Sequence, residues 1–218
     1  MRNKLTIVLD EASINLKESL VNFSCVYIFK CSCGWNTNVN ISVNELNKFI
    51  EANNIINCIV VASSLGVFTA LTYANKYPQK IIGLVLLDPS HQNQGISALS
   101  ILNSYNIPFS TELEDLRCFF SSANEMSETG ATEITKIQTL HELPLLILAA
   151  GDLKFPNVIN KEIKQKLIED RHKMLKEYCK LSEKSEFIII SNVGHGIASE
   201  KPQEVAEKIN KYFLNNNY

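Results

Sequence analysis

Short apolar runs rich in β-branched residues alternate with amphipathic segments along nearly the whole chain. Each run is almost continuously apolar and is bounded by polar or turn-forming residues. Such runs are typical of strands buried on both faces, which occur in parallel sheets covered by helices on each side. The predicted strands are residues 5–9, 25–29, 58–62, 81–87, 145–149 and 187–190. The sequence therefore predicts an α/β fold with a mostly parallel sheet.

Helical spacing of apolar residues fills most of the intervals between these runs. The predicted helices are residues 43–53, 65–77, 157–181 and 202–214. Residues 90–143 break the alternation, because they hold no obvious strand and have helical periodicity around 113–120. We expect a single domain over residues 1–218, with 90–143 as an inserted cap. An insertion there lies over the carboxyl ends of the strands, where α/β proteins bind ligands.

Composition excludes several classes of function. The 218 residues carry 21 basic and 23 acidic side chains, so the net charge is −2. A nearly neutral chain lacks the basic face that nucleic-acid binding needs, and we expect no nucleic-acid partner. No apolar run approaches the roughly 18 residues of a membrane-spanning helix. The N-terminal run is too short for a signal peptide, so we expect a cytoplasmic protein; the oligomeric state stays open.

The six cysteines form no evident disulfide or metal framework. Cys25 and Cys58 lie inside apolar runs, where a thiol behaves as a small hydrophobic group. Cys31 and Cys33 have the wrong spacing for a zinc knuckle, and no second Cys/His pair stands at a matching distance. We therefore expect reduced thiols and no metal site.

Residues 60–66 join a predicted buried strand directly to a predicted helix. Ser64 stands at this junction, with Ala62 two positions before it and Gly66 two positions after it. A sharp strand-to-helix turn needs small residues at both positions, and it lifts the serine oxygen above the edge of the sheet. Ser63 is also compatible with an ordinary N-cap. The pattern favours Ser64 as a candidate nucleophile.

Among the four histidines, His195 is the best placed for chemistry. It follows the last predicted strand and lies between two glycines. An imidazole with a pKa near neutrality can take a proton from a hydroxyl nucleophile. His91 is a weaker candidate at the same edge of the sheet, whereas His141 and His172 are predicted to lie in a loop and on a solvated helix.

A carboxylate is expected to orient the imidazole. Asp152 follows the fifth predicted strand and completes the chain order Ser64, Asp152, His195. Asp88 is the alternative, because it also ends a strand. Its simpler interpretation is a turn formed with Pro89, so we predict Asp152 as the acid.

These motifs resemble those of the α/β-hydrolase family, and the resemblance spans almost the whole chain. Residues 58–94 are similar to the family's nucleophile elbow, the helix after it and the next strand. Residues 145–152 resemble the strand that leads to the acid, and residues 188–202 resemble the catalytic-histidine loop. Gly34-Trp35-Asn36 falls where many members carry a G-x-G-W-S sequence.

The chain departs from the family pattern near its start. It begins at about the family's third strand, so two leading strands are expected to be missing. Residues 5–9 are then expected to form an edge of the sheet that a partner chain could cover. Asp10-Glu11 stands near the place of the usual His-Gly pair. The resemblance implies an oxyanion hole made by the N–H of Leu65 and an N–H of Glu11 or Ala12. The acidic pair beside this hole would oppose catalysis, because the charge that develops there is negative. The family's usual slot for the acid is Leu153, one residue beyond Asp152.

The resemblance implies a serine hydrolase that needs no metal or organic cofactor. Ser64 would attack the carbonyl of a carboxylic ester and form an acyl-enzyme, with an amide or thioester as the less favoured substrate. His195 would transfer the proton, and Asp152 would orient His195. The competing hypothesis is a non-catalytic binding or scaffolding protein with the same fold, because fold alone does not fix function.

Overall fold

The computed structural model describes residues 5–32 and 38–215. These residues form a six-stranded sheet in the order β2-β1-β3-β4-β5-β6, in which every neighbouring pair is parallel. The strands are β1 (Thr6–Asp10), β2 (Cys25–Phe29), β3 (Cys58–Ser63), β4 (Ile81–Leu87), β5 (Leu145–Ala150) and β6 (Ser185–Ile190). All the predicted strands and the parallel sheet are therefore confirmed.

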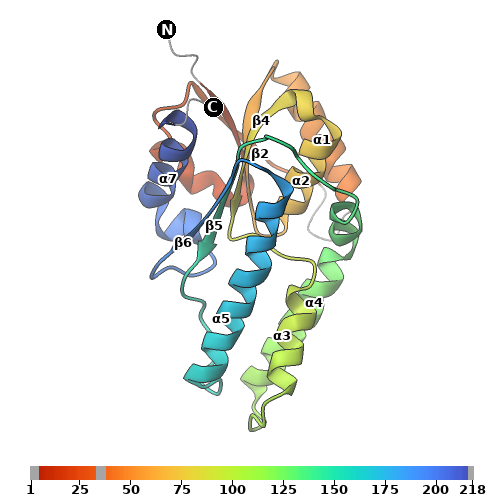
Figure 1. Ribbon diagram of the computed structural model, residues 1–218, viewed down its shortest axis with the longest axis vertical. Coiled ribbons are helices and arrows are strands. Elements are labelled where there is room, and N and C mark those ends of the chain that lie inside the picture. Colours follow the sequence, from red (N-terminus) through yellow and green to blue (C-terminus); the bar gives the residue numbers. More distant parts are fainter. Residues whose placement is uncertain (1–4, 33–37, 216–218) are drawn as a thin grey trace.

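Helices cover both faces of the sheet (Figure 1). One face packs against η1 (Glu11–Ser19), α6 (Ile197–Glu200) and α7 (Pro202–Asn215). The other face packs against α1 (Val39–Ala52), α2 (Gly66–Lys76) and η3 (Lys176–Leu181), while η2 (Pro78–Lys80) leads into β4. Side chains alternate between the two layers: Val60 and Ala62 face α1 and α2, whereas Ile59 and Val61 face α7. Burial on both faces explains why these strands read as continuous apolar runs.

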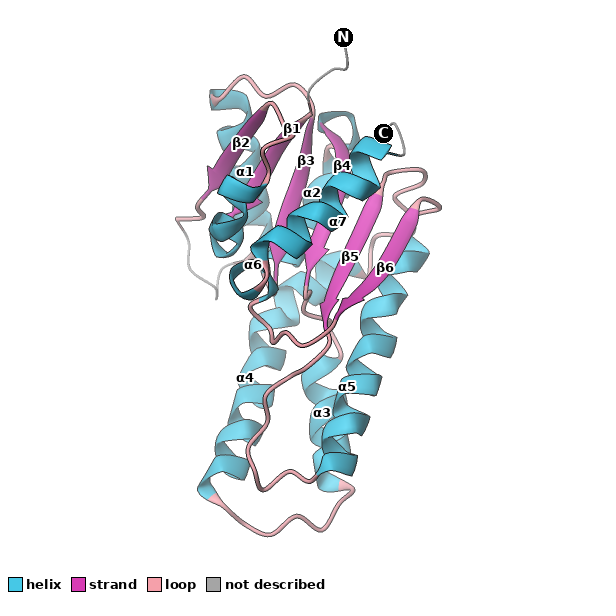
Figure 2. Cartoon of the chain, turned by 90° about the vertical axis from the view of Figure 1, so that its left-hand side faces the viewer, coloured by secondary structure: helices cyan, strands magenta, loops and turns pink. Residues whose placement is uncertain are grey.

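The remaining helices extend beyond the carboxyl ends of the strands (Figure 2). They are α3 (Gln94–Asn103), α4 (Thr111–Ile134) and α5 (Lys161–Leu175), and they share a small apolar core of their own. The stretch between β4 and β5 thus holds helices and no strand. Gly130 anchors α4 to α2, because a Cβ at this position would lie 2.5 Å from the ring of Phe68.

Three sequence expectations need correction or restriction. Strand β1 is no edge, because β2 and β3 pair with it on either side. The helix expected over 157–181 begins at Lys161 and changes to the 3-10 helix η3 after Leu175. The Gly34-Trp35-Asn36 motif lies outside the described residues. Within residues 5–32 and 38–215, no helix is long and apolar enough to cross a membrane.

Candidate active site

Ser64 occupies the sharp turn between β3 and α2. Its φ is 51°, a left-handed conformation that costs energy for a residue with a side chain. The small neighbours are required here, because a Cβ at Gly66 would lie 2.8 Å from Oδ2 of Asp10. The backbone N–H of Ser64 donates to the carbonyl of Leu87 at 3.2 Å, which ties the turn to the end of β4. This arrangement is the sharp strand-to-helix turn that the sequence predicts at Ser64.

His195 lies within hydrogen-bond distance of Ser64. Its Nε2 is 3.0 Å from Oγ of Ser64, and its Nδ1 is 2.5 Å from Oδ2 of Asp88. An ionised carboxylate only accepts hydrogen bonds, so Nδ1–H donates to Asp88 and the neutral ring leaves Nε2 as an acceptor for the Ser64 hydroxyl. The imidazole is therefore held in the tautomer that can take a proton from serine.

Asp88 holds the place that the sequence analysis gave to Asp152. It follows β4, is completely buried, and has a φ of 43° that turns it out of the strand direction. Its Oδ1 accepts the backbone N–H of Ala150 at 2.8 Å. Burial by itself would raise the pKa of Asp88, but the guanidinium of Arg171 and the bond to His195 hold that pKa below its ordinary value.

The prediction of Asp152 as the partner of His195 is wrong. Asp152 lies one strand further along the sheet, and its side chain is exposed. Its backbone N–H donates to the carbonyl of Val193 at 3.0 Å, so the residue helps to hold the loop before His195 by its main chain. The imidazole itself is bonded to Asp88.

Arg171 is the site residue that the sequence analysis missed. Its Nη1 donates to Oδ1 of Asp88 at 2.7 Å, and its Nη2 donates to the carbonyl of Pro89 at 3.2 Å. A signal was present in the sequence of α5, where Ile163, Leu167 and Leu175 form a buried stripe whose members are four and eight residues apart. Arg171 continues this stripe, and a charged residue on a buried stripe requires a partner.

Further hydrogen bonds join the elbow to the turn after β4. The N–H of Ser90 donates to the carbonyl of Ser64 at 3.1 Å, and the hydroxyl of Tyr178 donates to the carbonyl of Ser90 at 2.7 Å. The Oγ atoms of Ser64 and Ser90 lie 3.5 Å apart. The turn that carries Ser64 is thus fixed through the main chain to the turn that follows β4.

The carboxyl group of Asp10 points at the turn that carries Ser63 and Ser64. Oδ1 accepts the N–H and the hydroxyl of Ser13 at 3.0 and 2.5 Å, and Oδ2 accepts the N–H of Ser63 at 2.5 Å. The hydroxyls of Ser13 and Ser63 are themselves 2.7 Å apart. Burial raises the pKa of Asp10 from 3.8 to about 6, against the opposing effect of these hydrogen bonds.

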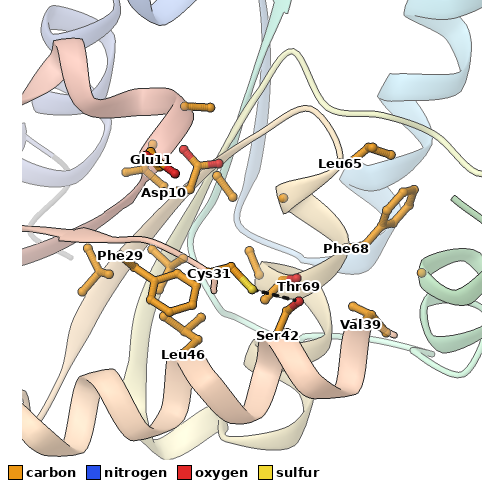
Figure 3. Close-up of a pocket in the computed structure, with 18 of the residues that line it drawn as sticks. Asp10, Glu11, Phe29, Cys31, Val39, Ser42, Leu46, Leu65, Phe68 and Thr69 are labelled. Carbon is orange, nitrogen blue, oxygen red and sulfur yellow. Dashed lines mark hydrogen bonds between the residues drawn. The ribbon is translucent and has the colours of Figure 1, made fainter. Parts of the chain in front are cut away.

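Leu65 lines two cavities. The first, here called the histidine cleft, has a volume of about 450 Å³ and is lined by Ser64 and His195 together with residues of α4. The second, here called the inner cavity, measures about 340 Å³ and lies between the sheet, α1 and α2. Glu11 and Ala12 line the inner cavity with Leu65, so the three predicted oxyanion residues lie around one space (Figure 3).

The other histidines have partners of their own. His91 is buried in the wall of the histidine cleft, with Nε2 3.5 Å from a carboxylate oxygen of Glu177, and burial lowers the pKa of His91. His172 is half-buried and its Nε2 is 2.7 Å from the carbonyl oxygen of Ala150, so the prediction of a solvated residue is wrong. His141 lies in a turn and is exposed.

Comparison with solved structures places this architecture among known proteins. An α/β hydrolase enzyme from a metagenome of sediments from the lagoon of Mar Chica, Morocco, matches with a TM-score of 0.63 and 15% identity, over 99% of this chain and 93% of that one. The chain has the α/β-hydrolase fold. A marine microorganism esterase matches with a TM-score of 0.59 and 15% identity, over 98% and 96% of the two chains.

A carboxylesterase structure from the thaumarchaeon Nitrososphaera gargenis shares the fold as well, with a TM-score of 0.55 and 12% identity over 96% of this chain and 89% of that one. No family model and no curated protein matches the sequence. The α/β-hydrolase resemblance read from the sequence motifs is thus confirmed at the level of the fold. At these identities the site must be argued from its own geometry.

Proposed function

We propose that this chain is a serine hydrolase that cleaves carboxylic esters through an acyl-enzyme. The observation that carries the proposal is the position of His195, whose two ring nitrogens lie 3.0 Å from Oγ of Ser64 and 2.5 Å from Oδ2 of Asp88. A hydroxyl, an imidazole and a buried carboxylate in this order form the arrangement that activates a serine.

In the first half of the reaction, Oγ of Ser64 forms a bond to the carbonyl carbon while its proton passes to Nε2 of His195. The negative charge that develops on the carbonyl oxygen is stabilised by the backbone N–H of Leu65 and by an N–H of Glu11 or Ala12. The bond to the alcohol oxygen then breaks, and His195 gives its proton to the departing alkoxide. The product alcohol departs, and the acyl group remains bound to Ser64 as an ester.

In the second half, water takes the place of the alcohol. His195 accepts a proton from the water while the water oxygen forms a bond to the acyl carbon. The bond between the acyl carbon and Oγ of Ser64 then breaks, and His195 returns the proton to Oγ. Asp88 stabilises the imidazolium that forms in each half and keeps the ring oriented. No step requires a metal or organic cofactor.

The neighbouring esterases and hydrolases support an ester substrate by analogy of fold. A non-catalytic binding protein is the second candidate, and the buried carboxyl of Asp10 beside the elbow favours it. A negative charge close to the oxyanion opposes its formation, because electrostatic interactions are strong in a site that excludes water.

Fluorophosphonate labelling, followed by intact mass, distinguishes the two candidates. We expect a single adduct on the wild-type protein and none on Ser64→Ala. Ser63→Ala is the matched control, since it removes the neighbouring hydroxyl and is expected to retain the adduct. A wild-type protein that is folded by circular dichroism but takes up no label would favour the binding protein.

A further inference from the structure

We propose that the two cavities lined by Leu65 divide the ester between them: the inner cavity binds an apolar acyl chain, and the histidine cleft binds the alcohol. This assignment rests on the proposed serine hydrolase. It adds the substrate class, namely esters whose acyl part is an apolar chain of small to medium length.

The alcohol side follows from the position of His195. The imidazole must protonate the leaving oxygen, so that oxygen has to lie within hydrogen-bond distance of Nε2. Ser64 and His195, whose Oγ and Nε2 are 3.0 Å apart, both line the histidine cleft, and α4 lines it with Leu116, Phe119, Phe120 and Ala123. The group attached to the leaving oxygen is therefore held in that cleft.

The acyl side follows from the tetrahedral carbon. Two of its four substituents, Oγ of Ser64 and the leaving oxygen, are fixed on the side of His195. The oxyanion points toward the backbone N–H groups of Leu65 and Glu11 or Ala12, and the acyl chain takes the remaining direction, away from the histidine cleft. These residues line the inner cavity, so the acyl chain is directed into it.

The walls of the inner cavity suit a chain of this kind. Phe29, Leu46, Phe68 and Val39 line it, together with Val60 and Ala62 from β3. Figure 3 shows Asp10 and Glu11 on one side of the space and Cys31, Ser42 and Thr69 gathered on the other. Oδ1 and Oδ2 of Asp10 already accept hydrogen bonds from Ser13 and Ser63.

The size of the cavity limits the chain. A volume of about 340 Å³ lies at the lower end of the range for small-molecule pockets. Each methylene of the acyl chain that is buried in the cavity adds to the binding free energy. We therefore expect kcat/KM to rise by up to about fourfold for each added methylene until the cavity is full.

The test compares one bulky substitution in each cavity. Thr69→Phe places an aromatic ring in the inner cavity from α2, and Ala123→Phe places the same ring in the histidine cleft from α4. Ser42→Leu narrows the inner cavity from α1 and replaces Thr69→Phe if that variant does not fold. Each protein is assayed with p-nitrophenyl acetate, butyrate, hexanoate and octanoate, and with the acetates of phenol, naphthol and 4-phenylphenol.

We expect Thr69→Phe to lower the ratio of kcat/KM between octanoate and acetate by at least about tenfold, with the preference among the alcohols unchanged. Ala123→Phe is expected to do the reverse. It lowers kcat/KM for the acetates of large alcohols, while the octanoate-to-acetate ratio of kcat/KM stays that of the wild type. The opposite pattern, or an equal loss for every ester in Thr69→Phe, would overturn the assignment.

Failure of the proposed function gives a different result. In that case the folded wild-type protein hydrolyses none of these esters and takes up no fluorophosphonate. Turnover that depends on Ser64, but whose preference among acyl chains is unchanged by substitutions in the inner cavity, would overturn only the assignment of the two cavities. The proposed serine hydrolase would stand.

Discussion

Nη1 of Arg171 lies 2.7 Å from Oδ1 of Asp88, and the two side chains are only 5% and 0% exposed. The other carboxylate oxygen of Asp88 is bonded to His195. A carboxylate in this position would lose its ionised form through burial if no cation lay beside it. Arg171 therefore keeps Asp88 able to orient the imidazole, and it ties α5 to the candidate active site.

Replacement of Arg171 is expected to destabilise the protein and to change its response to pH. Arg171→Met leaves Asp88 buried without a cation, which typically costs about 3–5 kcal/mol at neutral pH. The pKa of Asp88 is then raised by burial, so the loss relative to wild type shrinks as pH falls and the carboxyl becomes neutral. Urea unfolding at neutral and acidic pH measures both effects.

Lys173→Met is the control for Arg171→Met, since it removes a positive charge from an exposed position on the same helix. We expect it to change the free energy of unfolding by no more than about 0.5 kcal/mol. Arg171→Lys restores the charge without the planar fork and is expected to recover part of the stability. An Arg171→Met protein as stable as wild type would show that the pair contributes nothing.

The two aspartates considered as the acid give opposite expectations. Asp88→Asn removes the charge that stabilises the imidazolium and is expected to lower kcat by about 10³- to 10⁴-fold. Asp152→Asn changes an exposed side chain and is expected to leave kcat within about twofold of wild type. Hydrolysis of p-nitrophenyl acetate, with thermal melting of both variants as a check on folding, decides between them. A severe loss in Asp152→Asn alone would contradict the structure.

The choice between these aspartates shows what the sequence could not predict. Both follow a buried strand, so the pattern places both at the carboxyl edge of the sheet. Which of them reaches His195 depends on backbone direction, and the left-handed φ of Asp88 has no sequence signal when the residue is followed by proline. The contact with Arg171 joins positions 83 residues apart, and no local pattern reports it.

The strands and the elbow were predictable because they depend on local periodicity and local sterics. Continuous apolar runs allow few alternatives to a covered parallel sheet. The small residues Ala62 and Gly66 around Ser64 similarly mark the sharp turn. The 3-10 helix η1 was missed, because its sequence has little amphipathic pattern and it is started by the side chain of Asp10, which accepts the N–H of Ser13.

The strained turn at Ser64 predicts that glycine is better tolerated there than alanine. Both Ser64→Gly and Ser64→Ala lose the hydroxyl, but only alanine keeps a Cβ at a φ of 51°. We expect Ser64→Gly to be more stable than Ser64→Ala by about 1 kcal/mol. The control is the same pair at Ser63, a strand residue, where the order is expected to reverse. Equal stability of the two Ser64 variants would mean that the turn relaxes without cost.

The buried carboxyl of Asp10 predicts a pH dependence opposite in sign to that of an ordinary ion-paired aspartate. Its pKa is raised from 3.8 to about 6 by burial, so between these values the folded state holds more protons than the unfolded state. The stability contributed by Asp10 is therefore fully present below about pH 3.8 and is lost as pH rises through about 6. This rise in the pKa from 3.8 to about 6 corresponds to a loss of about 3 kcal/mol in the free energy of unfolding.

Asp10→Asn removes this titration while keeping the shape of the side chain. The difference in free energy of unfolding between variant and wild type is therefore expected to move in favour of the variant, by about 3 kcal/mol, as pH rises from about 4 to 7. Asp115→Asn makes the same chemical change at an exposed position of α4 and serves as the control. A difference between Asp10→Asn and wild type that stays constant over this range would show that Asp10 is ionised throughout, held by the hydrogen bonds from Ser13 and Ser63.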